Sequence, residues 1–192
     1  MSLKLYFHPL ASFCHKALIA LYENGIPFEP IVVDLADEAS NAAFRKVWPM
    51  TKMPVLRDEA RDRTVAESST VIEYLDAFYP GATRFLPDDP DRAWQTRIWD
   101  RFYDHYVQEP MQKIVTDRLR PAGQSDGHGV EQAKRQLLEA YKVAGPMMQS
   151  KTWAMGDYFT LADCAAAPTF SMPIRSCLLA APKRIYRPIW TG

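Results

Sequence analysis

The sequence contains little cysteine, carries no net charge and has no long apolar run. Its three cysteines form no CxxC pair and no even framework, which argues against a disulfide scaffold and favours reduced thiols in a cytoplasm. Lysine plus arginine and aspartate plus glutamate both number 23. This balance gives no electrostatic reason to expect nucleic acid or an anionic membrane as a partner.

Segments typical of membrane or secreted proteins are also missing. No apolar run approaches the roughly 20 residues of a membrane-spanning helix. The N-terminal MSLKLYFHPL lacks the long apolar core and small-residue cleavage site of a signal peptide. We therefore expect a cytoplasmic protein without a membrane partner. Its 192 residues, 47% of them hydrophobic, can bury a core in one domain or in two small ones.

Residues 1–80 show the pattern of an α/β domain. An alternating, aromatic-rich segment over 3–7 predicts a strand. The apolar spacing that begins at Cys14 predicts a helix that ends near Gly25, and residues 28–35 predict a second strand. Strand, helix and strand at this length indicate a parallel pair with a right-handed crossover.

The remainder of this domain predicts three more features. They are a short helix over 41–48, an antiparallel hairpin from PVLRD and RTVAE, and an amphipathic helix over 68–80. The order βαβ, α, ββα then gives a mixed four-stranded sheet.

Residues 81–90 are rich in proline and predict a linker. The chain beyond it, 91–192, predicts an all-helical domain. Thr160 and Asp163 predict a capping box at the start of its last clear helix. From about residue 169 the tail is atypical, because it has several prolines and basic residues but no acidic residue. It is either a divergent segment or a truncated or out-of-frame end.

Three motifs in this order resemble the cytosolic glutathione transferase family. They are HPLASFCHKALIALYENGIPFE, WPMTKMPVLRD and AESSTVIEYLD, and FTLADC stands where the family keeps a helical capping motif. The resemblance covers about residues 3 to 168. It implies a thioredoxin-like N-terminal domain followed by a helical C-terminal domain, as in bacterial members. It also implies glutathione as co-substrate, no metal, and a homodimer with the 69–78 and 91–117 helices at the interface.

The second motif implies contacts with the glutathione backbone. In the family the bond before Pro54 is cis, and the N–H and C=O of Met53 face the peptide as a short antiparallel strand would. The alternative is an ordinary trans proline that starts a strand. Lys52 is implied to reach the glycine carboxylate, and its alternative is a solvated surface lysine.

The third motif implies the γ-glutamyl site. Glu67 and Ser68 lie where a strand gives way to a helix, and free N–H groups and the positive end of the helix dipole favour an anion there. The resemblance assigns the γ-glutamyl carboxylate to Ser68 and the ammonium to Glu67. Alternatively, Ser68 only caps the helix.

The first motif concerns thiol activation. A free thiol has a pKa of about 8.5, so a hydroxyl donor, N–H groups and a helix dipole are needed to favour thiolate. We predict Ser12 as the catalytic hydroxyl donor with the Phe13 N–H beside it, although an ungapped alignment places the family's catalytic position on Ala11. Cys14 is either a buried apolar thiol or a redox thiol. With His8 and His15 it fits no structural zinc spacing.

An aromatic-rich stripe on the first long helix of the second domain predicts the acceptor site. From Trp99, Phe102, Tyr103, Tyr106 and Met111 we select Tyr103, Tyr106 and Met111 as candidates, with core packing as the alternative for most of them. The atypical tail would alter the usual wall of this site.

The leading hypothesis is a glutathione-dependent transferase that attacks a small electrophile with glutathione thiolate; isomerase or peroxidase chemistry through the same thiolate is compatible with it. One alternative is a non-catalytic adaptor that binds a protein partner. The other is a glutathione-dependent thiol-disulfide or peroxide reductase that uses Cys14.

Overall fold

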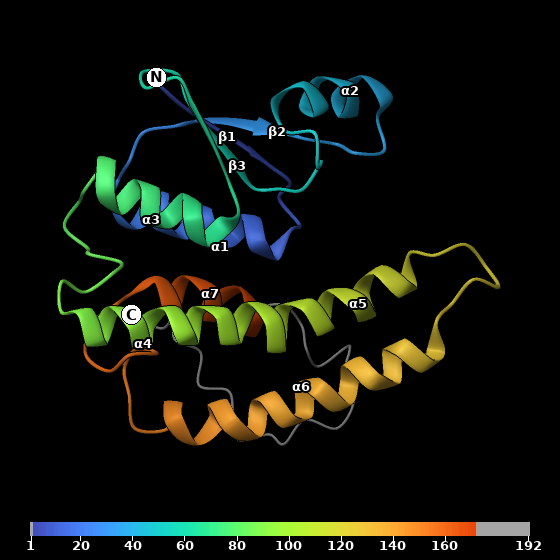
Figure 1. Ribbon diagram of the computed structural model, residues 1–192. Coiled ribbons are helices and arrows are strands. Elements are labelled where there is room, and N and C mark those ends of the chain that lie inside the picture. Colours follow the sequence, from blue (N-terminus) through green and yellow to red (C-terminus); the bar gives the residue numbers. More distant parts are fainter. Residues whose placement is uncertain (1, 172–192) are drawn as a thin grey trace.

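The computed structural model describes residues 2–171, so the predicted tail lies outside the described residues from 172 onward. Figure 1 shows a small sheet with its helices stacked on a layer of longer helices. The elements of the first part are β1 (Leu3–Phe7), α1 (Ser12–Glu23), β2 (Glu29–Val32), α2 (Glu38–Val47), β3 (Val55–Asp58), β4 (Arg63–Ala66) and α3 (Ser68–Phe78).

The sheet is mixed and four-stranded, as predicted. Its order is β2–β1–β3–β4. The β1 strand pairs in parallel with β2, and the other two pairs, β1 with β3 and β3 with β4, are antiparallel. The α2 helix begins at Glu38, earlier than the sequence predicts, because the Asp37 carboxylate accepts a hydrogen bond from the Ser40 N–H at 2.7 Å and caps the helix.

The second part is helical over the described residues, as predicted. Its elements are α4 (Pro90–Phe102), the π-helix η1 (Tyr103–Gln108), α5 (Glu109–Arg118), α6 (Gly127–Met148) and α7 (Leu161–Ser171). The sequence predicted one uninterrupted helix over 91–117 and missed the π-helix. The interruption precedes Pro110, which has no N–H to donate and whose ring clashes with an α-helical carbonyl four residues earlier. Within residues 2–171, no helix combines the length and apolarity needed to cross a membrane.

The predicted cap of α7 is present. The Asp163 carboxylate accepts hydrogen bonds from the Thr160 N–H at 2.9 Å and from the Thr160 hydroxyl at 3.0 Å. It also accepts from the Ala154 N–H at 2.6 Å. One carboxylate therefore fixes both the start of α7 and the turn before it.

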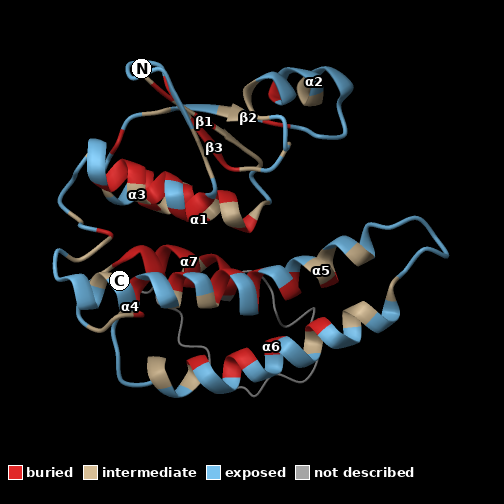
Figure 2. Cartoon of the chain, viewed as in Figure 1, coloured by how far each residue is buried: buried red, intermediate tan, exposed pale blue. Residues whose placement is uncertain are grey.

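Helix α7 connects the two parts of the molecule. Leu161 and Cys164 belong to the core between the sheet, α1 and α3, whereas Ala162, Ala165 and Ala166 belong to the core of the helical part. Figure 2 shows α7 almost wholly buried and α2 largely exposed. Because α7 contributes to both cores and packs against α1 and α4, it joins the first part of the molecule to the helical layer.

Candidate active site

The three predicted motifs meet at one edge of the sheet. Tyr6 of β1 lies opposite Val55 of β3, and Val55 lies opposite Ala66 of β4. The first motif follows β1, the second ends just before Val55, and the third begins at Ala66. The pairing register therefore brings the starts of α1 and α3 and the Met53–Pro54 bond to the same edge.

At this edge, Ser12 is the first residue of α1 and is buried, with 7% of its surface exposed. Ala11 is the N-cap residue, and no side chain caps the helix within the described residues. The Ala11 carbonyl accepts from the N–H groups of Cys14 and His15. Ser12 and the Phe13 N–H thus lie in the first turn, where the helix dipole favours negative charge.

The Cys14 thiol lies inside the protein rather than at this edge. It is fully buried, and burial raises the pKa of Cys14 to about 11. The two nearby histidines hold the turn instead of a metal: His8 Nδ1 accepts from the Leu10 N–H at 3.2 Å, and His15 Nε2 lies 2.6 Å from the Pro9 carbonyl oxygen. No group of three or more potential ligands within residues 2–171 is placed to hold a metal ion.

The Met53–Pro54 peptide bond is cis, as the resemblance implied. Pro54 is buried, Met53 is half-buried and Lys52 is exposed. Met53 precedes β3, and the ladder between β1 and β3 ends at Tyr6 and Val55. The backbone groups of Met53 therefore lie beyond the paired part of the sheet.

The start of α3 has an unusual backbone and no side-chain cap. Glu67 holds the N-cap position with φ 66°, a left-handed conformation that a residue with a Cβ rarely adopts, and no side chain caps α3 within the described residues. Ser68 is the first helical residue and is buried, and the N-cap position, which the alternative gave to Ser68, falls on Glu67. Residues held at positive φ cluster at ligand-binding sites, and the first N–H groups of α3 remain for an external anion.

A buried charge cluster lies beneath the start of α3. Lys16 Nζ on α1 donates to Ser69 Oγ and to Asp104 Oδ2, both at 2.7 Å, and lies 2.5 Å from Asp100 Oδ1. Arg101 Nη1 donates to Asp100 Oδ2 at 2.7 Å and to Ser69 Oγ at 2.5 Å. Sequence reasoning missed this cluster. It ties α1 and α3, which carry the predicted glutathione contacts, to the helical layer.

Two of the three acceptor-site candidates lie in the helical core. Tyr103 is buried and donates to Met148 Sδ at 3.2 Å, and burial raises the pKa of Tyr103. Met111 is buried in the same core. Tyr106 is 53% exposed and lies against Phe102, with ring centroids 5.3 Å apart. The burial favours packing roles for Tyr103 and Met111, and Tyr106 alone of the three is available to a ligand.

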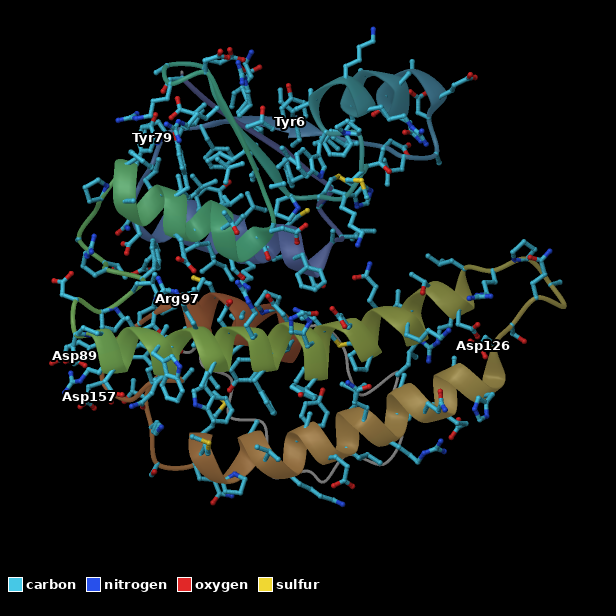
Figure 3. All side chains as sticks on the ribbon, viewed as in Figure 1. Tyr6, Tyr79, Asp89, Arg97, Asp126 and Asp157 are labelled. Atoms are coloured by element: carbon cyan, nitrogen blue, oxygen red, sulfur yellow. The ribbon has the colours of Figure 1, made fainter. Side chains whose placement is uncertain are left out.

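A cavity of about 360 Å³ lies elsewhere, between α5 and the first half of α6. It is lined mainly by polar side chains, among them His105, Glu109, Lys113, Asp126, His128 and Gln136. Two polar contacts lie in its lining: His105 Nδ1 is 2.8 Å from Glu109 Oε1, and Lys113 Nζ forms an ion pair with Asp126 Oδ2 at 2.5 Å. Figure 3 shows Asp126 at the far end of the helical layer, where α6 begins. None of the predicted glutathione contacts lines this cavity.

The chain matches two family models. Residues 5–83 match the model of the glutathione S-transferase N-terminal domain, and residues 102–176 match that of the glutathione S-transferase C-terminal domain. The glutathione S-transferase U22 of Arabidopsis thaliana is 31% identical over 157 residues, which are 81% of this chain and 66% of that protein. Protein LigF of Sphingobium sp. is 33% identical over 108 residues, 55% of this chain and 41% of LigF. The chain thus spans about two thirds of the first relative and less than half of the second.

Solved structures have the same fold. A glutathione S-transferase of Methylobacterium radiotolerans in complex with glutathione sulfonate is 26% identical, with a TM-score of 0.76 over 88% of this chain and 77% of that one. The structure of β-etherase LigF has a TM-score of 0.77 at 20% identity, over 88% of this chain and 82% of that chain.

Proposed function

Because the chain belongs to the glutathione S-transferase family, we propose that it binds glutathione and transfers it as thiolate to a small electrophile. The observation that carries this proposal is the shared edge of the sheet. The start of α1, the cis Met53–Pro54 bond and the uncapped start of α3 lie there together. A tripeptide that spans this edge reaches all three features.

Each end of glutathione has a proposed partner at this edge. The γ-glutamyl carboxylate binds Ser68 and the free N–H groups of α3, and the ammonium binds Glu67, which is exposed. The main chain of the cysteine residue pairs with Met53, and Lys52 reaches the glycine carboxylate. A similar glutathione S-transferase structure contains glutathione sulfonate, an analogue of glutathione, and this supports glutathione as the ligand proposed here.

Thiol activation is assigned to Ser12 and the Phe13 N–H. Both lie in the first turn of α1, where a hydroxyl donor, an amide donor and the helix dipole each favour the thiolate. The reductase alternative loses support because Cys14 is fully buried and its pKa is raised to about 11 by burial. Only a trace of such a thiol is ionised near neutral pH.

One of the similar proteins bears on the class of electrophile. The similarity to LigF, whose structure is described as a β-etherase, favours an aryl ether as a second candidate substrate class. The thiolate would attack the ether carbon, and the aryl oxygen would leave with the bonding electrons and take up a proton. Tyr106 and Phe102 form an aromatic pair against which an aromatic ring can stack.

A homodimer and a cytoplasmic location are part of the same proposal. Trp94 and Ile98 on α4 are exposed, and Arg97 between them faces α3 and pairs with Glu73 at 3.0 Å (Figure 3). An apolar stretch beside the α3–α4 contact suits a symmetric interface formed by these two helices. Sedimentation that showed only a 21.9 kDa species at micromolar concentration would contradict the dimer.

Two measurements test the proposed activity. Calorimetric titration with glutathione should show binding, and transfer to chlorodinitrobenzene should be glutathione-dependent. Ser12→Ala should leave glutathione binding nearly intact and slow transfer by about 10²–10³, whereas Cys14→Ser should leave transfer unchanged. No binding at millimolar glutathione would favour the adaptor. Unchanged transfer in Ser12→Ala with loss in Cys14→Ser would move the chemistry to the protein thiol.

A further inference from the structure

Three residues other than glycine hold a positive φ angle within residues 2–171: Thr51 at 51°, Asp62 at 50° and Glu67 at 66°. Asp62 lies in the turn between β3 and β4 and pairs with Arg57, and aspartate tolerates this conformation in turns. Glu67 lies at the start of α3, at the proposed γ-glutamyl site. Thr51 has neither explanation, because it is β-branched, and a β-branched residue at positive φ is an outlier.

The turn that contains Thr51 is held in place on both sides. The Thr51 N–H donates to the Trp48 carbonyl at 3.1 Å and closes the turn that follows α2. Pro49 takes the second position of this turn, where proline is favoured. Trp48 and Met53 pack against the small core around Phe44. A glycine would take the same backbone conformation at position 51 without strain, so the turn itself gives no reason for a threonine there.

Thr51 belongs to the loop that enters the proposed glutathione site. It directly precedes Lys52, which is proposed to reach the glycine carboxylate, and lies two residues before Met53. The Thr51 side chain is half-buried, so a ligand can reach it from solvent. Within residues 2–171 its hydroxyl forms no hydrogen bond with another residue. The hydroxyl is therefore available to a ligand of this loop.

Thr51 and Glu67 approach the same end of the β3–β4 pair. Val55 begins β3 and lies opposite Ala66, the last residue of β4. Thr51 precedes Val55 by four residues, and Glu67 follows Ala66 directly. Residues held in rarely populated backbone conformations cluster at ligand-binding sites, where the surrounding structure maintains the strain. The position of Thr51 thus indicates a role toward the ligand of this edge.

We propose that Thr51 is a specificity-determining residue whose hydroxyl donates a hydrogen bond to the carboxylate at the glycine end of glutathione, beside Lys52. The inference rests on the proposed function. A glycine at position 51 would fit the backbone but could not supply the hydroxyl, which accounts for the strained threonine. The contact favours glutathione over a thiol ligand without a terminal glycine, because the terminal carboxylate of such a ligand lies one residue short of this position.

Calorimetric titration with glutathione and with γ-glutamylcysteine, which lacks the glycine, tests this assignment. Thr51→Val keeps the β-branch and the size of the side chain and removes only the hydroxyl. It should weaken glutathione binding about tenfold or more, because a hydrogen bond to a charged group is lost. It should leave the affinity for γ-glutamylcysteine unchanged. Thr51→Ser retains the hydroxyl and should bind both ligands as the wild type does.

Two further variants complete the test. Thr51→Gly removes the strain together with the hydroxyl, so its melting temperature should not fall below that of the wild type, while its affinity for glutathione should fall as in Thr51→Val. Thr64→Val, at an exposed threonine on β4, is the control and should keep the wild-type affinities. Wild-type glutathione affinity in Thr51→Val, or equal losses for the two ligands, would overturn the inference and leave the proposed function intact. Absence of glutathione binding by the wild type at millimolar concentration would overturn both.

Discussion

Paired charges occur in two regions of the molecule, and their surroundings differ. At the junction of α1, α3 and η1, Lys16 is 1% exposed and lies within 2.7 Å of carboxylate oxygens of Asp100 and Asp104. In the cavity between α5 and α6, Lys113 and Asp126 lie 2.5 Å apart with more than a third of each side chain exposed. The charged atoms lie at similar distances in the two regions. Only the buried cluster is shielded from solvent, so its charged groups depend on one another for the interactions that water supplies at the surface. The buried cluster therefore fixes how the two layers meet, while the exposed pair is screened by solvent.

Removing the buried cation should have the largest effect. Lys16→Met leaves two buried carboxylates facing each other with only the half-exposed Arg101 as counter-ion, and breaking such a pair costs about 3–5 kcal/mol. The free energy of unfolding from urea titrations measures this loss. Lys113→Met in the exposed pair is the control and should cost far less. Equal losses in the two variants would mean that burial does not distinguish the regions.

A buried carboxylate held mainly by hydroxyl groups sharpens the comparison, because its ion pair with the half-exposed Arg61 is long, with Arg61 Nη1 3.5 Å from Asp58 Oδ2. Asp58 is fully buried and accepts from the hydroxyls of Tyr79 at 2.6 Å and Tyr74 at 2.7 Å. Burial alone would raise the pKa of Asp58, but these hydrogen bonds and two backbone N–H groups lower it overall. Asp58→Asn turns one acceptor oxygen into a donor that faces other donors, so we expect a loss of about 1.5–3 kcal/mol.

The pH dependence of this contribution has a definite sign. Because the folded pKa of Asp58 is lowered, its stabilisation is present above the unfolded pKa of about 3.9 and is lost as pH falls through the folded value. Unfolding titrations at neutral and acidic pH should show a smaller difference between wild type and Asp58→Asn in acid. Asp62→Asn, at an exposed carboxylate paired with Arg57, is the matched control.

The start of α3 offers a comparison between a buried and an exposed hydroxyl on one helix. Ser68 is buried and Thr70 is exposed. If Ser68 binds the γ-glutamyl carboxylate, Ser68→Ala should lose a charged hydrogen bond and weaken glutathione binding about ten- to a hundredfold. Glu67→Ala should weaken it to a similar extent, and Thr70→Ala should not. Calorimetric titration also gives a ligand control, because Cys-Gly lacks the γ-glutamyl end and should bind equally to wild type and Ser68→Ala.

The sequence indicated the edge of the sheet far better than the junction beneath it. The parallel strand pair, the hairpin and the start of α3 follow from local turn residues and alternation, which depend on a few neighbouring residues. The cis bond at Pro54 was implied by the family resemblance and not by the residues around it. Lys16 was overlooked because a lysine on a helix is normally solvated. Its burial depends on Asp100 and Asp104, which are more than 80 residues away in the chain.

The same limit applies to the acceptor site. Tyr103 and Met111 have the helical spacing of a ligand-binding stripe, but that spacing does not distinguish a cleft from a core. The π-helix then changes which side chains share a face, and Pro110 was the only local signal for it. Gln108 stood outside the aromatic pattern, so its burial became apparent only from the packing of the helices.

The final prediction uses the opposite pKa directions of the two regions and has the smallest expected effect. Burial raises the pKa of Asp104, with Lys16 opposing this shift and Asp100 adding to it. The hydrogen bond from Lys113, together with the Gly129 N–H, lowers the pKa of Asp126. The folded protein therefore holds a proton on Asp104 more tightly than the unfolded chain does, and holds one on Asp126 less tightly.

The signs of the two contributions follow directly. The contribution of Asp104 is fully present below the unfolded pKa of about 3.9 and is lost as pH rises through its raised folded value. The contribution of Asp126 is present above the unfolded pKa and is lost as pH falls through its lowered folded value. The free energy of unfolding should be measured from about pH 3 to pH 7. As the pH rises, Asp104→Asn should lose less of this free energy than wild type does, and as the pH falls, Asp126→Asn should lose less of it than wild type does. A wild-type slope in Asp104→Asn would mean that Lys16 keeps Asp104 ionised throughout this range, and that the buried cluster responds to pH no differently from the exposed pair.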